Sequence, residues 1–327
     1  MNPPPLPCPE IPAAYSIAAV ERESGLSKDT LRMWERRYGF PAPLRDAQGE
    51  RLYPAAQVER LRQLRRLIHA GHRPGKVVAL GADELAVLLA SAAVRTPAPA
   101  SRTGRSARAL PAVAAQGVLV AQCLDLIAAH DVAALREQLT RAVLTLGLQG
   151  CVLQLVAPLT REVGLAWLQG RFQVFEEHLY TECVTGVLRG AIASVPATAA
   201  AGTPRVLLTT FTQEQHGLGL LMLEAVLALQ GCLCLSLGTQ TPHVDIVRAA
   251  QAFRADIVAL SFSGVLAPAQ VRAGLRELRA QLPMPARLWA GGQGAGVIPD
   301  EAAGVDLVRE LEAVAQALAD WRVANTR

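Results

Sequence analysis

A carboxylate and an imidazole two residues apart form the pattern in this chain that is best suited to chemistry. Glu214, His216 and Gly219 make an E-x-H-x-x-G motif directly after the apolar run at 205–211. An imidazole can coordinate a metal, and a carboxylate that binds the other ring nitrogen fixes the tautomer. The glycine lets the backbone pass close to a large ligand. The motif predicts that His216 reaches a metal whose other ligands come from a macrocycle, although a loop histidine is also compatible with an ordinary polar role.

Two further signals indicate a ligand site near this motif. Ser261 follows Gly219 by forty-two residues at the end of one apolar run, and Gly291 and Gly292 close the next. Ligands of parallel sheets bind beyond the carboxyl ends of the strands, so these residues would converge on one elongated ligand. The sequence GGQGAG that begins at Gly291 could suggest a dinucleotide loop, but its spacing is wrong and no glycine-rich loop follows the first strand.

A third pattern lies upstream, where nine residues separate Trp167 from the adjacent pair Glu177 and His178. The tryptophan offers a flat apolar face, and the pair offers polar contacts. The alternative interpretation is a core tryptophan and a solvated pair.

The N-terminal part of the chain is basic. Residues 15–80 hold thirteen Lys and Arg against seven acids, whereas fifteen Arg face eighteen acids from residue 109 onward. A basic module on a mildly acidic body is typical of a nucleic-acid-binding head, and it is also compatible with a basic surface that has no partner.

The basic segment carries a helix-turn-helix pattern. Ser16 can cap a first helix that ends at Gly25, and Ser27 can cap a second helix over Lys28–Tyr38. Leu31 and Trp34 or Tyr38 would face the core. The side chains expected to face DNA are Lys28, Thr30, Arg32 and Arg36 or Arg37.

A hairpin signal follows, with the turn DAQG inside PLRDAQGERLY. It predicts a wing whose Arg45 and Arg51 lie near the phosphate backbone, and Tyr53 is predicted to contact DNA with them. A further helix would then bury Val58, Leu61, Leu64 and Ile68.

The elements that must position the metal-binding motif alternate between strands and helices. The expected strands are 205–211, 232–238, 256–264, 286–292 and 306–308, and the expected helices between and after them are 216–230, 243–254, 267–281 and 309–322. This alternation predicts a parallel sheet with helices on both faces, in a Rossmann-like or flavodoxin-like layout.

The rest of the chain divides by periodicity. Residues 117–195 predict three or four packed helices, with Val120, Cys123, Leu124 and Ile127 on one face, continued by Val143, Leu144, Leu148, Val152 and Leu155. The multidomain α and α/β organisation is therefore a DNA-binding head at 13–82, a flexible linker at 94–115, a helical bundle at 116–200 and an α/β domain at 204–324.

Composition limits the class of protein. The 327 residues suggest two or three domains, and 51% apolar with 4% aromatic residues favour helices and buried parallel strands. The sequence contains no run of eighteen apolar residues, so no membrane span is predicted. The Pro-rich leader lacks the pattern of a signal peptide. The six scattered cysteines predict buried free thiols and a cytoplasmic protein.

Residues 15–80 resemble the MerR family of transcription regulators, and the run from Trp34 to Tyr38 resembles its CarH/LitR branch. The downstream motifs resemble the cobalamin-binding signature D/E-x-H-x-x-G, S-x-L and G-G. The resemblance implies that His216 is the lower axial ligand to cobalt, with the nucleotide tail beside Ser261 and the paired glycines. Ser263 stands where that signature usually has leucine, which puts the packing of the tail in doubt.

The Trp167 pattern resembles the helical cap of the CarH/LitR light sensors, in which Trp, Glu and His accommodate the 5′-deoxyadenosyl group. The resemblance implies a repressor, not an enzyme, that binds adenosylcobalamin and operator DNA in the dark as a dimer or tetramer. Light would break the cobalt–carbon bond, the cap would shift, and DNA would be released. Leu168 stands where light-responsive relatives can carry a histidine, so that residue cannot supply a ligand after photolysis.

Two alternatives remain from the sequence. One is a corrinoid protein that carries methyl groups, which the basic head argues against. The other is a MerR-type regulator that responds to a different ligand, a different chromophore, redox state or a protein partner.

Overall fold

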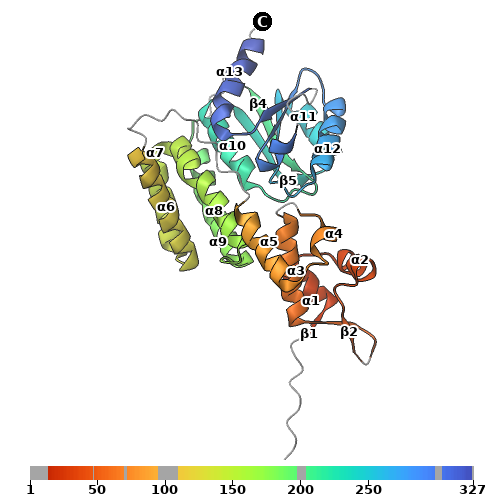
Figure 1. Ribbon diagram of the computed structural model, residues 1–327. Helices are drawn as coiled ribbons and strands as arrows, with labels where there is room; N and C mark the ends of the chain where they lie inside the picture. Colours follow the sequence, from red (N-terminus) through yellow and green to blue (C-terminus); the bar gives the residue numbers. More distant parts are fainter. Residues whose placement is uncertain are drawn as a thin grey trace, which may run out of the picture. The chain divides into compact units, whose positions relative to one another are not determined.

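The computed structural model describes residues 14–46, 48–69, 72–94, 110–196, 204–298 and 304–325. The chain forms two compact units, Met1–Pro97 and Ala98–Arg327 (Figure 1). The predicted leader and most of the predicted linker lie outside the described residues. The last residues of that linker are helical, because α6 begins at Leu110.

Two capped helices open the first unit. In α1 (Ile17–Ser24) the Ser16 hydroxyl accepts from the Ala19 amide at 3.3 Å, and in α2 (Lys28–Tyr38) Ser27 accepts from the Thr30 amide at 3.2 Å. Gly25 and Gly39 end the helices in the left-handed conformation, with φ of 64° and 68°, which a residue without a Cβ adopts at little cost. The predicted helix-turn-helix is confirmed.

A small antiparallel sheet and three further helices complete the first unit. The sheet has the order β1-β3-β2, and its β2–β3 hairpin is the predicted wing. The strands are β1 (Ala14–Ser16), β2 (Leu44–Arg45) and β3 (Arg51–Pro54), and the helices are α3 (Ala55–His69), α4 (Pro74–Val77) and α5 (Ala82–Val94). Leu85 of α5 is fully buried in the core of this unit, so the head extends beyond the predicted boundary at residue 82.

A helical bundle opens the second unit. Its elements are α6 (Leu110–Ala128), α7 (Val132–Gly150), the π-helical turn η1 (Cys151–Val156), α8 (Ala157–Leu168) and α9 (Val174–Ala193). The buried face of α7 is set by Leu135, Leu139 and Ala142, and the helix kinks at Gly147, where φ is 71°. Leu144 lies off that face and is 81% exposed, so its predicted core position is wrong. Leu144 has helical spacing to Leu148 and Val152, but it lies on the other side of the kink. The same spacing therefore does not place it on their buried face.

One described stretch, Val132–Leu168, is long and apolar enough to cross a membrane by length and composition. It is kinked at Gly147, and its Leu139 and Leu155 pack into the bundle core. Burial within the bundle accounts for part of its apolar composition, since 39% of its apolar window is buried.

Five strands form a parallel sheet in the order β5-β4-β6-β7-β8, which confirms the predicted α/β architecture. The strands are β4 (Arg205–Phe211), β5 (Leu233–Thr241), β6 (Ile257–Ser261), β7 (Arg287–Gly291) and β8 (Val305–Val308). The helices are α10 (Leu218–Leu229), α11 (His243–Phe253), α12 (Pro268–Gln281), α13 (Val314–Asn325) and the short η2 (Gln293–Val297) and η3 (Leu311–Ala313).

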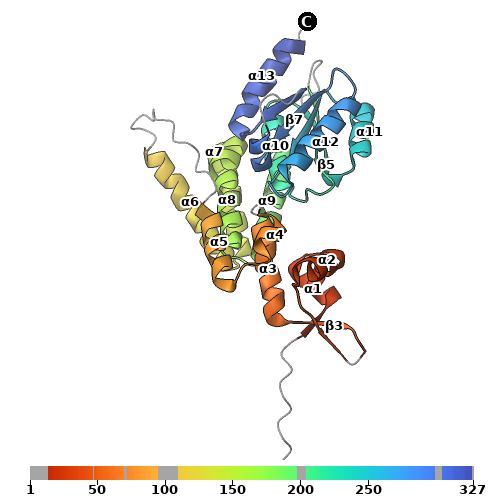
Figure 2. The ribbon, with the colours of Figure 1, turned by 45° about the vertical axis from the view of Figure 1, so that its right-hand side comes forward.

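Successive strand residues supply two cores, because side chains alternate between the faces of a sheet. Val206 and Leu208 belong to the core shared with α10, α13 and the bundle, whereas Leu207 belongs to the core under α11 and α12. Figures 1 and 2 show these helix pairs on opposite sides of the sheet. The bundle and sheet also meet in an ion pair between Arg189 of α9 and Glu224 of α10, with Nη1 and Oε2 2.6 Å apart.

The five described cysteines are free thiols, as predicted. Cys123, Cys151 and Cys183 are buried, while Cys232 and Cys234 are half-buried beside the core. Burial raises the pKa of Cys151 to about 11, which keeps this thiol protonated near neutral pH.

Candidate functional site

The predicted metal-binding motif lies where β4 ends and before α10 begins. Glu214 is fully buried, and its Oε1 lies 2.7 Å from His216 Nδ1 and accepts from the His216 amide at 3.1 Å. Its Oε2 accepts from the amide and the hydroxyl of Ser263, both at 2.8 Å. The carboxylate is therefore held by the His216 loop on one oxygen and by the loop after β6 on the other.

The charge state of Glu214 follows from these contacts. Burial raises the pKa of a carboxyl group, but the hydrogen bonds from His216 and Ser263 outweigh burial and hold the pKa of Glu214 below its ordinary value. The group is therefore ionised at neutral pH and can only accept, so His216 Nδ1 carries the proton. Metal coordination would then fall to Nε2, and 41% of the His216 side chain is exposed.

The structure brings Gly219 and Ser261 together, as the sequence predicts. A Cβ on Gly219 would lie 2.5 Å from the Ser261 hydroxyl oxygen, so only glycine fits there without a shift. Thr210, which the sequence interpretation missed, ties the same loop to β5. Its hydroxyl donates to the Glu214 carbonyl at 2.6 Å and accepts from the Gln240 amide at 2.9 Å.

The paired glycines have a packing role that sequence reasoning did not anticipate. A Cβ on Gly291 would lie 2.6 Å from the Val308 carbonyl oxygen, and one on Gly292 would lie 2.5 Å from the Phe262 carbonyl oxygen. Gly292 also has a φ of 84°. Gly291 lets β7 lie close to the end of β8, and Gly292 lets the loop after β7 approach the backbone after β6. Both glycines therefore shape the carboxyl edge of the sheet whether or not they contact a ligand.

The donor set fits a metal that brings most of its own ligands. Among the described residues, no three His, Cys, Asp or Glu side chains gather where they could hold an ion. His216 is a single imidazole with an ordered carboxylate partner. Nearby, a side chain on Gly219 would collide with the Ser261 hydroxyl. These residues fit the cobalt of a corrin, for which a protein need supply only an axial ligand.

The three bundle residues lie on two helices. Trp167 is half-buried near the end of α8, and Glu177 and His178 are in the first turns of α9. Glu177 accepts from the Thr181 hydroxyl at 2.8 Å and lies 3.7 Å from His178 Nε2. The His178 side chain is 70% exposed, so it is accessible to a ligand.

Glu176, which was not among the residues predicted from the sequence, fixes the start of α9. Glu176 is buried, accepts from the Gln173 amide at 2.5 Å and lies 3.2 Å from His130 Nε2. The sequence signal for this role is a capping box, formed by Gln173 and Glu176 three residues apart at the start of the helix. This contact anchors the turn that carries Glu177 and His178.

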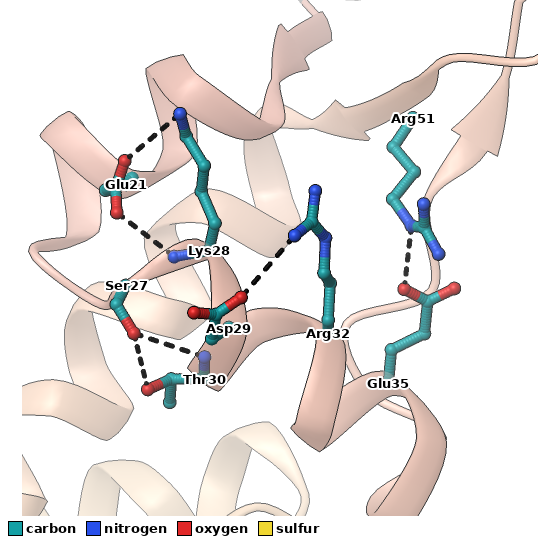
Figure 3. A network of polar contacts seen from close by, with 8 residues as sticks. All are labelled: Glu21, Ser27, Lys28, Asp29, Thr30, Arg32, Glu35 and Arg51. Carbon is teal, nitrogen blue, oxygen red and sulfur yellow. Dashed lines mark hydrogen bonds and ion pairs between the residues drawn. The ribbon is translucent and has the colours of Figure 1, made fainter.

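Three of the predicted DNA-binding residues of α2, Lys28, Thr30 and Arg32, make polar contacts within the helix-turn-helix (Figure 3). Lys28 pairs with Glu21 at 3.6 Å and Arg32 with Asp29 at 3.4 Å, while the Thr30 hydroxyl lies 2.9 Å from that of Ser27. These exposed pairs are weak, so DNA phosphates can replace the acidic partners. Arg36 and Arg37 are exposed, and in the wing Arg45 donates to the Gly49 carbonyl at 2.8 Å.

Of two further wing residues, Arg51 has a partner on α2, and Tyr53 differs from the sequence prediction. Arg51 Nε donates to Glu35 Oε2 at 2.9 Å, which joins the wing to α2 (Figure 3). Tyr53 is fully buried, and its hydroxyl has no hydrogen-bond partner within the described ranges. The prediction that Tyr53 contacts DNA is therefore wrong, because the side chain points from β3 into the core.

We expect Arg36→Ala to weaken binding to operator DNA by about 1–3 kcal/mol if the guanidinium meets a base, and by less if it meets phosphate. Fluorescence anisotropy of a labelled duplex would measure the effect. Arg22→Ala is the matched control, because it removes the same charge from the exposed end of α1. Equal losses in both variants would show a general charge effect and contradict the proposed orientation of α2.

The comparisons with known proteins match all three parts of the chain. Residues 15–80 match the model described as MerR HTH family regulatory protein, and residues 119–189 and 204–319 match two models described as B12 binding domain. These matches confirm the predicted order of head, bundle and α/β domain.

Two curated relatives extend over most of the chain. The HTH-type transcriptional repressor CarH of Myxococcus xanthus is 30% identical over 284 residues, which cover 86% of this chain and 89% of CarH. The HTH-type transcriptional repressor CarA of the same organism is 31% identical over 288 residues, which cover 85% and 86%. Among solved structures, the monomethylamine corrinoid protein of Methanosarcina barkeri is 14% identical, with a TM-score of 0.48 over 61% of this chain and 96% of that protein.

Proposed function

Because this chain belongs to the CarH-type branch of the MerR family, whose members join a MerR head to B12-binding domains, we propose that it is a light-responsive transcriptional repressor. It is a cobalamin-binding transcriptional regulator, a role that is not enzymatic. In the proposal, adenosylcobalamin favours operator binding in the dark, and light releases the protein from DNA.

The observation that carries the proposal is the ordered pair of His216 and Glu214 at the carboxyl edge of the sheet. The buried carboxylate contacts His216 Nδ1, which would leave Nε2 to hold the cobalt, and Gly219 leaves room for the Ser261 hydroxyl at the same edge. Ser261, Gly291 and Gly292 would hold the nucleotide tail. When bound, adenosylcobalamin supplies a cobalt–carbon bond that visible light breaks.

The bundle residues would make the site selective for the adenosyl form. Trp167 offers a flat surface for the adenosyl group, and Glu177 and His178 offer hydrogen bonds to its polar atoms. Since α9 packs on α10, which follows the His216 loop, a change in the bundle can reach the sheet through α10. A ligand that fits one arrangement of the bundle better than another shifts the equilibrium between them.

Oligomerisation would convert this shift into a change in DNA affinity. One winged helix makes few contacts with a duplex, whereas heads linked in a homo-oligomer gain effective concentration at adjacent half-sites. In this proposal the protein is cytoplasmic, and in the dark it binds operator DNA as a dimer or tetramer.

The test measures DNA affinity and oligomer mass in darkness and after green light. Duplexes selected by the adenosylcobalamin-loaded protein from a random pool would serve as probes. We expect tight binding in the dark and at least about a tenfold loss after light, with a fall in mass by light scattering; tenfold is 1.4 kcal/mol. Protein loaded with methylcobalamin, protein without cobalamin and Trp167→Ala are the controls. Equal affinity in dark and light would contradict light sensing and favour a regulator of another kind.

A further inference from the structure

Ser263 makes contacts that the cobalamin signature does not anticipate. It lies two residues beyond the end of β6, at the position where that signature usually has leucine. Its amide and its hydroxyl both reach Glu214 Oε2 at 2.8 Å, although the two residues are forty-nine positions apart in the chain. Ser263 thus closes a chain of contacts that runs from the loop after β6 through Glu214 to His216.

The direction of the Ser263 hydroxyl is fixed from its other side. The Val265 amide lies 3.4 Å from Ser263 Oγ and donates to it, so the hydroxyl hydrogen is left to point at Glu214. Leucine at this position would keep the amide contact but would place an apolar side chain against a buried carboxylate. Loss of a hydrogen bond to a buried charged group is costly, and the carboxylate would turn to find another donor.

The two carboxylate oxygens have separate tasks. Oε1 contacts only the His216 amide and imidazole, and Oε2 contacts only Ser263 in the described hydrogen bonds. A rotation of the carboxylate would therefore break the contact that sets the imidazole. Anchoring Oε2 prevents that rotation before any ligand arrives, and a pre-ordered site loses less entropy on binding.

We propose that Ser263 is a positioning residue, which holds Glu214 so that His216 keeps its Nδ1-protonated form and directs Nε2 toward the cofactor. The proposal rests on the proposed cobalamin site and goes beyond the family motif, because this chain uses serine where leucine is usual. In this proposal Ser263 acts on the imidazole through Glu214.

The first test uses the full chain without cobalamin. Nitrogen NMR of protein labelled with ¹⁵N-histidine, in mildly alkaline buffer, reports which ring nitrogen of His216 carries the proton. The His216→Ala spectrum assigns the signals. We expect one Nδ1-protonated form in wild type and in Ser263→Thr, and a mixture of both forms in Ser263→Ala and Ser263→Leu. Ser236→Ala on β5 is the matched control and should leave the signals unchanged.

The second test uses the same labelled proteins loaded with cob(II)alamin. Coupling of the unpaired electron to an axial ¹⁵N splits each EPR line in two, whereas the unlabelled nitrogen of the cofactor's own base would split it in three. We expect two-line splitting in wild type and Ser263→Thr, and a partial loss in Ser263→Ala and Ser263→Leu. Affinity should fall by about 10–100-fold in these two variants, the range for residues that orient a ligand.

The outcomes separate the two proposals. A three-line wild-type spectrum, or no cobalamin binding, would overturn the proposed function, while the NMR test would still decide the role of Ser263. One Nδ1-protonated form in Ser263→Ala and Ser263→Leu, with unchanged melting temperature, would overturn the positioning role. Circular dichroism checks folding, and rescue by threonine excludes a merely structural effect.

Discussion

Replacing His216 with alanine is expected to weaken adenosylcobalamin binding by on the order of 100-fold or more. Residues that only orient a metal ligand typically contribute about 10–100-fold in affinity, and His216 is the proposed ligand itself. The buried Glu214 would also lose the imidazole at 2.7 Å, although its contacts with Ser263 and Thr210 would remain. Equilibrium dialysis in darkness would measure the affinity, and the absorption spectrum would report the axial ligand.

Two variants bracket this prediction. Glu214→Gln should have the milder effect, because an amide can still contact the imidazole. His243→Ala, at the start of α11, is the matched control, since its Nδ1 pairs with Glu277 at 3.7 Å rather than with the loop. The weak DNA binding of the head by itself should survive each change, whereas the cobalamin-dependent tight binding in the dark, and with it light-dependent release, should be lost in His216→Ala. Full affinity and an unaltered spectrum in His216→Ala would show that another group is the axial ligand.

Trp34→Ala is expected to destabilise the DNA-binding head by about 3–5 kcal/mol, the usual cost of removing a buried aromatic side chain. Trp34 is 1% exposed, and its ring meets that of Tyr38 edge to face at 6.4 Å between centroids. A small domain has little stability to spare, so the head should be largely unfolded near physiological temperature and DNA binding should be lost.

Urea unfolding and DNA anisotropy would measure both effects in the full chain. Met33→Ala is the matched control, because Met33 is the exposed neighbour of Trp34 on α2 and should change stability little. Cobalamin binding should persist, since the cofactor residues belong to the other compact unit. A Trp34→Ala head that keeps both its stability and its affinity for DNA would contradict the placement of α2 on this core.

Features that depend on local chemistry could be predicted from the order of the amino acids. Capping by Ser16 and Ser27 is visible in the sequence because the serine hydroxyl and the backbone amide that donates to it lie within one turn. The alternation of apolar runs with helix-length segments predicted the parallel sheet, because chain order constrains how such elements pack. The pairing of Glu214 with His216 was also predictable, since two residues in one loop stay close in any fold.

Tertiary structure alone decided which distant residues meet and which way side chains face. Ser263 reaches Glu214 only because parallel strands β4 and β6 are neighbours and end at the same edge of the sheet. Arg51 pairs with Glu35 because the wing folds back on α2. Tyr53 turned into the core and Leu144 toward solvent because strand register and a helix kink fix side-chain direction, and neither is set by residues nearby in sequence.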